Sequence, residues 1–330
     1  MIKYDLESKA MLPCISVIIC THNPRHDYLD KVLKALRVQT LSSELWELLL
    51  IDNASEKPIN LEINLDWHPQ ARHIREEELG LTPARLRGIR EARAELLVFV
   101  DDDNVLDSDY LEVALQISHE KPWIGAWGGQ IRAEFEVPPP EWAKPYLPCL
   151  AIREFNEDKW SNLLHQHETT PCGAGLCIRK SIAEKYVELI QNDPKRLGLD
   201  RKGALLISCG DSDLAFTACD MGFGTGQFVA LKLAHLIPVN RLEEDYLLRL
   251  VEGILYSNII LESFRGKLPP ATRVSWRGKL FEYYRIWRMS RRERLFHGVF
   301  KRAYTLAEQK LIELQSNKQT DNYRSHKSLN

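Results

Sequence analysis

Three consecutive aspartates, Asp101, Asp102 and Asp103, directly follow the apolar run Leu96–Val100. An uninterrupted run rich in Val and Phe predicts a strand that is buried on both faces, as in parallel sheets. Three carboxylates at the end of such a strand repel one another unless a cation binds them. Mg²⁺ and Mn²⁺ take carboxylate oxygens and keep coordination positions for substrate phosphates. The pattern therefore indicates a divalent metal with a bound phosphate, and the alternative is an acidic turn that leads into the next helix.

Two earlier apolar runs, over residues 15–20 and 48–51, also end in polar residues, namely Thr21, Asn23, Asp52 and Asn53. Helical spacing follows over residues 28–38 and again over residues 82–94, where Thr82 is the expected cap. Alternating strands and helices predict an α/β, Rossmann-like fold with a mostly parallel central sheet flanked by helices. Because ligands bind at the carboxyl ends of the strands in such sheets, we expect these polar residues to share one site.

Small and polar residues later in the chain supply further candidates: Gly173, Ala174 and Gly175 in a small-residue turn, Asp211 and Asp213 at a helix start, and His235 in a strand. The glycines would permit a ligand to approach the backbone closely. A lone histidine in a strand is either a metal ligand or an ordinary core residue. The aromatic-rich stretch over residues 134–170 suits either a sugar or lipid face or a loop pinned by its aromatic side chains.

The charge of the chain is unevenly distributed. The 330 residues are 44% hydrophobic and 27% charged, as in an ordinary globular protein with one large core or two domains. Residues 265–330 contain 16 Lys or Arg and 5 Asp or Glu, whereas the residues before them contain 28 and 41. We therefore expect an acidic catalytic domain over residues 1–264 and a basic region after it.

The seven cysteines show no paired CxxC spacing, and several lie in apolar runs. This predicts reduced thiols rather than a disulfide framework or a zinc site. The first 11 residues are polar, unlike a signal peptide, and no run approaches the ~20 apolar residues that span a bilayer. We expect a cytoplasmic protein.

Together the motifs resemble those of the family 2 glycosyltransferases, which have the GT-A fold. The similar segments are SVIICTHNPRHDYLDKVLKALRVQT, LLLIDNAS, GLTPARLRGIREARAELLVFVDDDN, GAGLCIRK, GDSDLAF and HLIP. They extend over roughly residues 15–240. The resemblance implies inverting transfer from a nucleotide-diphosphate sugar, most often UDP-linked, with Mn²⁺ or Mg²⁺ as the cofactor. It also implies a saccharide or lipid-linked acceptor in polysaccharide or glycolipid biosynthesis of the cell envelope.

The resemblance also implies roles for single residues. The nucleotide-sugar would contact Thr21, Asn23, Arg25, Asp52, Asn53, Arg85, Asp101 and Asp102. Within this set Asp52 would accept a hydrogen bond from the base, and Asp102 would reach the ribose. Asp101 and Asp103 match the two acids of the DxD motif, and Asp103 with His235 would hold the metal.

Asp211 matches the family's general base, and residues 173–175 with Asp213 match elements near the donor or acceptor sugar. Two positions depart from the family's usual pattern. Leu86 stands where Asn is frequent, and Gly210 precedes Asp211 where Glu is frequent. The second departure leaves Asp213 as a rival for the base.

The basic region over residues 265–314 has helical periodicity. One apolar stripe contains Leu295, Phe296, Val299, Phe300, Ala303 and Leu306, and the polar side contains Arg291, Arg292, Arg294, Lys301 and Arg302. Such a helix either lies on an anionic membrane, peripherally at its inner face, or packs on the catalytic domain. Residues 315–330 are polar, and we expect them to be disordered.

Other functions fit less well. A nucleotidyltransferase normally has a glycine-rich phosphate loop, which the segment THNPRHD lacks. A non-catalytic sugar-nucleotide or carbohydrate-binding protein would not need the full set of acids. The acidic body argues against a nucleic-acid partner.

Overall fold

The computed structural model describes residues 12–201, 206–267 and 276–327. The chain divides into two compact units that interleave along the sequence. Unit 1 contains Met1–Glu136, Ala151–Pro194 and Asp211–Ile237, and unit 2 contains Val137–Leu150, Lys195–Gly210 and Pro238–Asn330. The boundary expected after residue 264 stays a prediction, and it falls inside unit 2.

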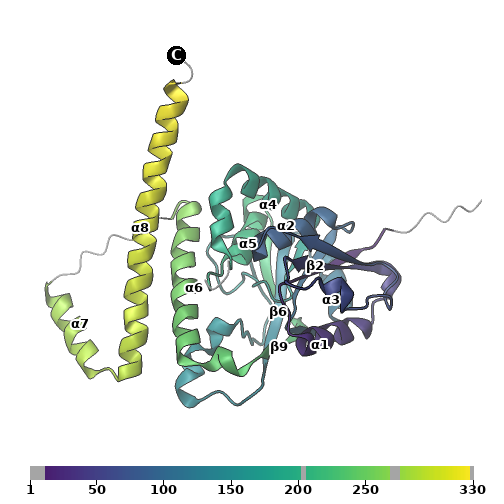
Figure 1. Cartoon of the computed structure of the whole chain (residues 1–330), viewed down its shortest axis with the longest axis horizontal. Helices are drawn as coiled ribbons and strands as arrows, with labels where there is room; N and C mark the ends of the chain where they lie inside the picture. Colours follow the sequence, from purple (N-terminus) through teal and green to yellow (C-terminus); the bar gives the residue numbers. More distant parts are fainter. Residues whose placement is uncertain (1–11, 202–205, 268–275, 328–330) are drawn as a thin grey trace, which may run out of the picture. The chain divides into compact units, whose positions relative to one another are not determined.

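Among the described residues, unit 1 is built on a nine-stranded sheet in the order β3-β2-β1-β4-β8-β6-β9-β5, with β7 paired to β9 (Figure 1). The strands are β1 (Ile15–Thr21), β2 (Trp46–Asn53), β3 (Ala71–Glu76), β4 (Leu96–Asp101), β5 (Asn104–Leu106), β6 (Ile124–Phe135), β7 (Lys159–Ser161), β8 (Cys177–Arg179) and β9 (Gly224–Ile237). The first four strands are parallel, as are β6 and β9, whereas β5, β7 and β8 are antiparallel to their neighbours. The mostly parallel α/β sheet expected from the sequence is confirmed.

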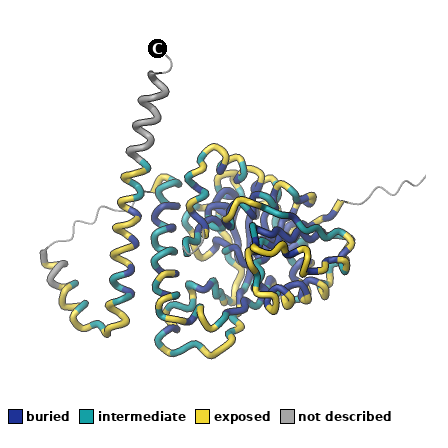
Figure 2. Tube along the Cα trace, viewed as in Figure 1, coloured by how far each residue is buried: buried dark blue, intermediate teal, exposed yellow. Residues whose placement is uncertain are grey.

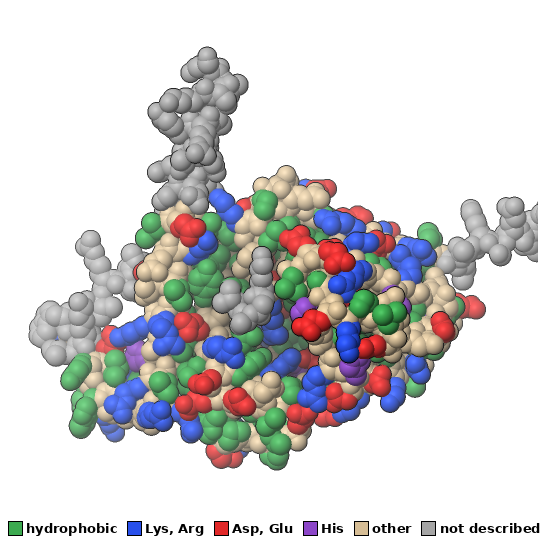
Figure 3. Space-filling view, viewed as in Figure 1, with side chains coloured by type: hydrophobic (Ala, Val, Ile, Leu, Met, Phe, Trp, Pro, Cys, Tyr) green, Lys and Arg blue, Asp and Glu red, His purple; other side chains and the backbone are tan. Residues whose placement is uncertain are grey.

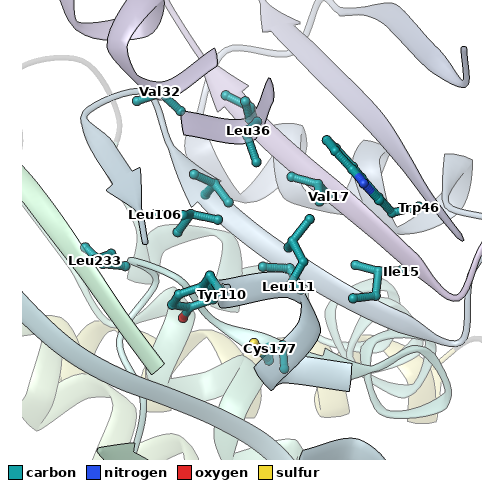
Figure 4. Close-up of a cluster of buried hydrophobic side chains, with 14 of the residues drawn as sticks. Ile15, Val17, Val32, Leu36, Trp46, Leu106, Tyr110, Leu111, Cys177 and Leu233 are labelled. Atoms are coloured by element: carbon teal, nitrogen blue, oxygen red, sulfur yellow. The ribbon is translucent and has the colours of Figure 1, made fainter. Parts of the chain in front are cut away.

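Helices cover both faces of this sheet (Figure 1). On one face, α1 (His26–Arg37) and α3 (Tyr110–Glu120) pack on alternate strand residues such as Ile15 and Val17 (Figure 4). On the other face lie α2 (Leu81–Glu91), α4 (Lys180–Asn192) and α5 (Gly210–Asp220). There a Cβ on Gly88 would lie 2.5 Å from Cγ2 of Ile18. Burial on both faces explains the continuous apolar runs of β1, β2 and β4 (Figure 2).

The start of α2 differs from the prediction. Its N-cap is Gly80, so the expected cap at Thr82 is wrong. Gly80 has a φ of 147°, a conformation that favours glycine, and its N–H donates a 2.8 Å hydrogen bond to Oδ1 of Asn53. The end of β2 therefore fixes the start of α2.

Unit 2 contains α6 (Glu244–Phe264), α7 (Trp276–Arg288) and α8 (Arg291–Lys327), with the short 3-10 segments η3 (Glu141–Leu150), η4 (Pro194–Leu199) and η5 (Val239–Leu242). α8 packs along α6 and buries Phe296, Val299, Ala303 and Ala307 (Figure 2). The buried part of the α8 stripe is thus a packing surface inside unit 2, whereas Phe300 and Leu306 of the same stripe are 45% and 47% exposed. Membrane contact through this helix stays a prediction. Among the described residues, no helix is long and apolar enough to cross a membrane.

Two further expectations fall in unit 2. Residues 315–327 continue α8, whereas the sequence suggested a disordered tail; this stretch has no Gly or Pro that would end a helix. In the aromatic-rich stretch, the ring of Tyr146 stacks on Phe296 with centroids 3.6 Å apart, and the Arg292 guanidinium lies 4.4 Å from the Trp142 ring. These two aromatic side chains pin η3 rather than form a sugar face.

Candidate active site

The carboxyl ends of three parallel strands place the first site residues side by side. In the sheet register Thr21 is paired with Asp52, and Cys20 is paired with Asp101. The Thr21 hydroxyl donates a hydrogen bond to the Asp102 carboxylate. The structure therefore brings the end of β1 into direct contact with the aspartates that follow β4.

The loop after β1 is tied to the loop after β2. Asn23 has a positive φ of 48°, which Asn tolerates better than most residues. Its N–H donates to Oγ of Ser55 at 2.9 Å, and its Oδ1 accepts from the N–H of Glu56 at 2.9 Å. Asn23 thus holds the loop after β1 against the loop after β2.

Asp52 is buried and almost fully hydrogen-bonded. It accepts from the N–H groups of Ser55 (3.1 Å) and Ile59 (3.3 Å) and from Nη1 of Arg75 (2.7 Å). Burial would raise the pKa of Asp52, but the hydrogen bonds from Ser55 and Arg75 outweigh it and hold that pKa below its ordinary value. The carboxylate is therefore ionised and fixed in orientation.

Arg75 is a site residue that the sequence did not reveal. It is the register partner of Asp52 on β3, and its side chain remains about one-third exposed at 34%. Arg75 also donates to the carbonyl of Ser55 at 3.0 Å. No motif in the sequence marked Arg75, because it meets Asp52 only through the register of β2 and β3.

Two residues predicted to contact the nucleotide, Asn53 and Arg25, make hydrogen bonds or ion pairs with other parts of unit 1. Nδ2 of Asn53 donates to the carbonyl of Glu78 at 2.7 Å, while its Oδ1 holds Gly80. Arg25 is exposed and forms 2.7 Å ion pairs with Asp27 and with Glu136 at the end of β6. Asn53 therefore ties the end of β2 to the start of α2, and Arg25 ties the start of α1 to the residue that follows β6.

Asp103 and His235 form a buried pair. Oδ2 of Asp103 lies 3.4 Å from Nε2 of His235, because β5 and β9 pair with Asn104 opposite the histidine. The Asn104 amide donates to Oδ1 of Asp103 at 2.9 Å. An oxygen and a nitrogen donor at this spacing fit one side of a Mn²⁺ or Mg²⁺ ion whose other positions go to phosphates and water. Among the described residues, no group of three or more His, Cys, Asp or Glu side chains is arranged to hold a metal alone.

Asp211 lies in the first turn of α5 and is partly exposed. Its Oδ2 accepts a 2.6 Å hydrogen bond from the N–H of Gly173, and its Oδ1 accepts one of 2.7 Å from Ser212. A Cβ on Gly173 would lie 2.3 Å from Nη2 of Arg85 and 3.5 Å from Oδ2 of Asp211. The side chains of Arg85 and Asp211 therefore both lie against the backbone of Gly173.

The remaining candidates are buried. Asp213 is fully buried, whereas Asp211 is partly exposed, so Asp211 is the more accessible of the two carboxylates. Gly175 has a positive φ of 72°, and its carbonyl accepts a 2.6 Å hydrogen bond from the hydroxyl of Tyr110. Ala174 lies between the two glycines with 5% of its surface exposed. Tyr110 was missed from the sequence because its helical position indicated only a core residue.

Relatives of known name match about a third of this chain. A segment is 32% identical over 115 residues to polypeptide N-acetylgalactosaminyltransferase 8 of Drosophila melanogaster and covers 34% of this chain and 19% of that protein. Another is 31% identical over 104 residues to glycosyltransferase AglE of Haloferax volcanii, covering 31% and 34%. The matched segments thus span between about a fifth and a third of the length of these relatives.

Solved structures of S. aureus TarS are also similar. The structure of TarS residues 1–349 has a TM-score of 0.48 and 14% sequence identity, covering 88% of this chain and 80% of that one. The corresponding complex with UDP-GlcNAc has a TM-score of 0.47 at 15% identity, covering 74% and 66%.

The sequence profile of the family described as "Glycosyl transferase family 2" matches residues 16–187. This span is more than half of the chain, and it contains Thr21, Asp52, Arg85 and the three aspartates after β4. The chain belongs to glycosyl transferase family 2.

Proposed function

We propose that the protein is an inverting, metal-dependent glycosyltransferase. It moves a sugar from a nucleotide-diphosphate sugar, UDP-linked, to a saccharide or lipid-linked acceptor in polysaccharide or glycolipid biosynthesis. The observation that carries this proposal is the convergence of Asp52, Asp102 and Asp211 on the carboxyl edge of one sheet, each held by a hydrogen bond from another element.

The donor would bind along the ends of β1, β2 and β4. Ionised Asp52, oriented by Arg75, would accept a hydrogen bond from the base. Asp102, held by Thr21, would reach the ribose, and buried Arg85 would supply positive charge near the phosphates.

Asp103 and His235 would hold Mn²⁺ or Mg²⁺. Asp101 is linked to the same turn, because its N–H donates a 3.2 Å hydrogen bond to Oδ1 of Asn104. When bound, this ion supplies positive charge that neutralises the leaving diphosphate. Asp103 itself is 6% exposed, so a cation at its carboxylate would act where charge interactions are stronger than in water.

Asp211 would act on the acceptor. An acceptor hydroxyl is a poor nucleophile until a base removes its proton, and a positioned carboxylate can do this. Backbone N–H groups of Gly173 and Ser212 orient the Asp211 carboxylate without neutralising it. A single displacement inverts the anomeric carbon and needs no second carboxylate as a covalent nucleophile.

A screen of nucleotide sugars tests this proposal. UDP-N-acetylhexosamines come first because the matched relatives include a polypeptide N-acetylgalactosaminyltransferase. With Mn²⁺ present, a UDP-sugar should raise the thermal midpoint and be slowly hydrolysed, and NMR should show the product anomer inverted. Binding without turnover would indicate a non-catalytic binding protein, and turnover of a nucleoside triphosphate with a sugar phosphate would indicate a nucleotidyltransferase.

The proposal also concerns the acceptor and the place in the cell where the enzyme would meet it. A lipid-linked acceptor would place the enzyme in the cytoplasm at the inner face of the cell membrane. Phe296, Val299 and Ala303 of the α8 stripe are buried inside unit 2, so they are not available for membrane contact.

A further inference from the structure

The helix α7 exposes its aromatic side chains rather than burying them. The exposed fractions are 69% for Phe281, 73% for Tyr283, 53% for Tyr284 and 70% for Trp287. Folded proteins seldom leave such large apolar side chains together in water unless the surface binds something. This aromatic face of α7 therefore has no partner within the described part of unit 2 that covers it.

Ion pairs orient α7 so that its polar side faces α8. Glu282 pairs with Lys301 of α8 at 2.9 Å and lies 3.6 Å from Nε2 of His297. The hydrogen bond from Lys301 holds the pKa of Glu282 below its ordinary value, so the carboxylate is ionised in this contact. The helix thus directs its carboxylate inward and its aromatic rings outward.

Exposed arginines accompany the aromatic face: Arg285 and Arg288 belong to α7 itself, and Arg291 and Arg294 to the first turn of α8. The Arg288 guanidinium lies 5.9 Å from the centre of the Tyr284 ring. Hydrophobic and basic side chains lie next to one another there, at the lower left of Figure 3. The neighbouring acid Glu293 accepts a 2.6 Å hydrogen bond from the N–H of Ser290 and keeps its charge, so four arginines stand against this one carboxylate. The surface is therefore both aromatic and strongly basic.

We propose that the aromatic face of α7 docks on an anionic lipid bilayer. Tyr and Trp combine an apolar ring with a polar tip and suit the interface between headgroups and acyl chains. Arginines beside them attract anionic lipids. A second copy of this chain is a poorer occupant, because a two-fold interface through this face would set arginines against arginines.

The inference rests on the proposed function for its purpose, which is to bring the enzyme to a lipid-linked acceptor. Its physical basis is separate, because membrane binding depends on α7 in unit 2 and donor chemistry depends on residues of unit 1. The two proposals can therefore fail independently.

Vesicle co-sedimentation of the full chain tests the inference. We expect binding to vesicles of phosphatidylglycerol and phosphatidylcholine, and little binding to phosphatidylcholine alone. The double variant Tyr284→Ser/Trp287→Ser should lose at least about tenfold in partitioning. Arg285→Gln and Arg288→Gln should each weaken it by about fivefold at low salt.

Matched controls are Leu61→Ser and Arg90→Gln, which change exposed residues of unit 1 and should leave binding unchanged. All variants should keep the thermal midpoint and the rate of donor hydrolysis, since none touches the catalytic residues. Absence of binding to anionic vesicles at low salt would overturn the inference, as would full binding by the Tyr284/Trp287 variant. A concentration-dependent dimer abolished by that variant would assign the surface to a second copy instead.

Discussion

The N–H of Gly173 donates a 2.6 Å hydrogen bond to Oδ2 of Asp211, which joins the small-residue turn before β8 to the first turn of α5. The same glycine lies against Arg85, because a Cβ there would be 2.3 Å from Nη2 of the arginine. Gly173 thus separates Asp211, the proposed base, from Arg85, the proposed positive charge near the phosphates.

Gly173→Ala should lower turnover by about 10- to 100-fold, because the methyl group must displace Arg85 or Asp211 from its place. Affinity for UDP should fall less than turnover, since the base pocket at Asp52 is unchanged. The measurement is donor hydrolysis and transfer at saturating donor. Gly198→Ala is the matched control, because nothing lies within 4 Å of a Cβ at that position. Equal activity of the two variants would contradict the proposed role of the Gly173 contact.

Asp211→Asn should abolish transfer while donor binding survives. The amide cannot take the acceptor proton, and loss of a positioned base typically costs about 10²- to 10⁴-fold. UDP titration calorimetry and a transfer assay would separate the two effects. Asp220→Asn, at the exposed far end of the same helix, should behave as the wild type. Near-normal turnover of the Asp211 variant would remove it from the mechanism.

The strands that carry the site were predictable because both of their faces are buried. Such burial leaves continuous apolar runs in β1, β2 and β4, and the first polar residue after each run marks the strand end. The contacts that orient these polar residues were not predictable. Arg75 and Asp52 are 23 residues apart and meet only through the register of β2 and β3.

The C-terminal helices show a second limit of the sequence. Periodicity located the apolar stripe of α8 correctly, but the same pattern fits a helix on a membrane and a helix on another helix. Only the structure shows that α8 packs along α6 with Val299 buried, and that Tyr146 of η3 stacks on buried Phe296. In α7 the side chain that faces α8 is the polar Glu282, and the aromatic rings of Tyr283 and Trp287 are exposed. A periodic pattern of apolar residues therefore does not show which side of α7 is packed.

Removing the divalent metal should weaken donor binding. We expect EDTA to reduce affinity for UDP by about tenfold or more, because the diphosphate would then meet Asp103 without a neutralising charge. His235→Gln should raise the Mn²⁺ concentration needed for half-maximal UDP binding by at least about tenfold. His119→Gln, an exposed position at the end of α3, is the control. Unchanged UDP affinity in EDTA would exclude a metal at the Asp103–His235 pair.

Tyr110→Phe should impair turnover without unfolding the protein. Its hydroxyl is buried and donates the 2.6 Å hydrogen bond that fixes the Gly175 carbonyl, so its loss should cost about 1 kcal/mol of stability. A purely structural role would lower the free energy of unfolding and leave kcat unchanged. A positioning role for the turn should also lower kcat at saturating donor and acceptor. Tyr186→Phe, at another buried tyrosine, would show how far stability alone affects the rate.

Arg75→Gln should destabilise the protein in a pH-dependent way. Asp52 has a lowered pKa in the fold, so its ion pair contributes stability above the ordinary carboxyl pKa of 3.8, and this contribution is lost as the pH falls through the lowered value. We expect the variant to be less stable than the wild type at pH 7, by an amount that solvent screening reduces because the side chain of Arg75 is 34% exposed.

The difference in unfolding free energy between wild type and Arg75→Gln should therefore shrink as the pH falls below 3.8, the ordinary carboxyl value. Urea titrations at neutral and acidic pH measure it. Arg87→Gln is the matched control: Arg87 forms a 3.0 Å ion pair with Glu91, whose side chain is 32% exposed against 6% for Asp52, so its loss should cost under about 0.5 kcal/mol. A difference that stays constant with pH would mean that Arg75 acts through packing rather than through Asp52. Loss of UDP affinity in the variant at pH 7, with the fold intact, would connect this ion pair to recognition of the base.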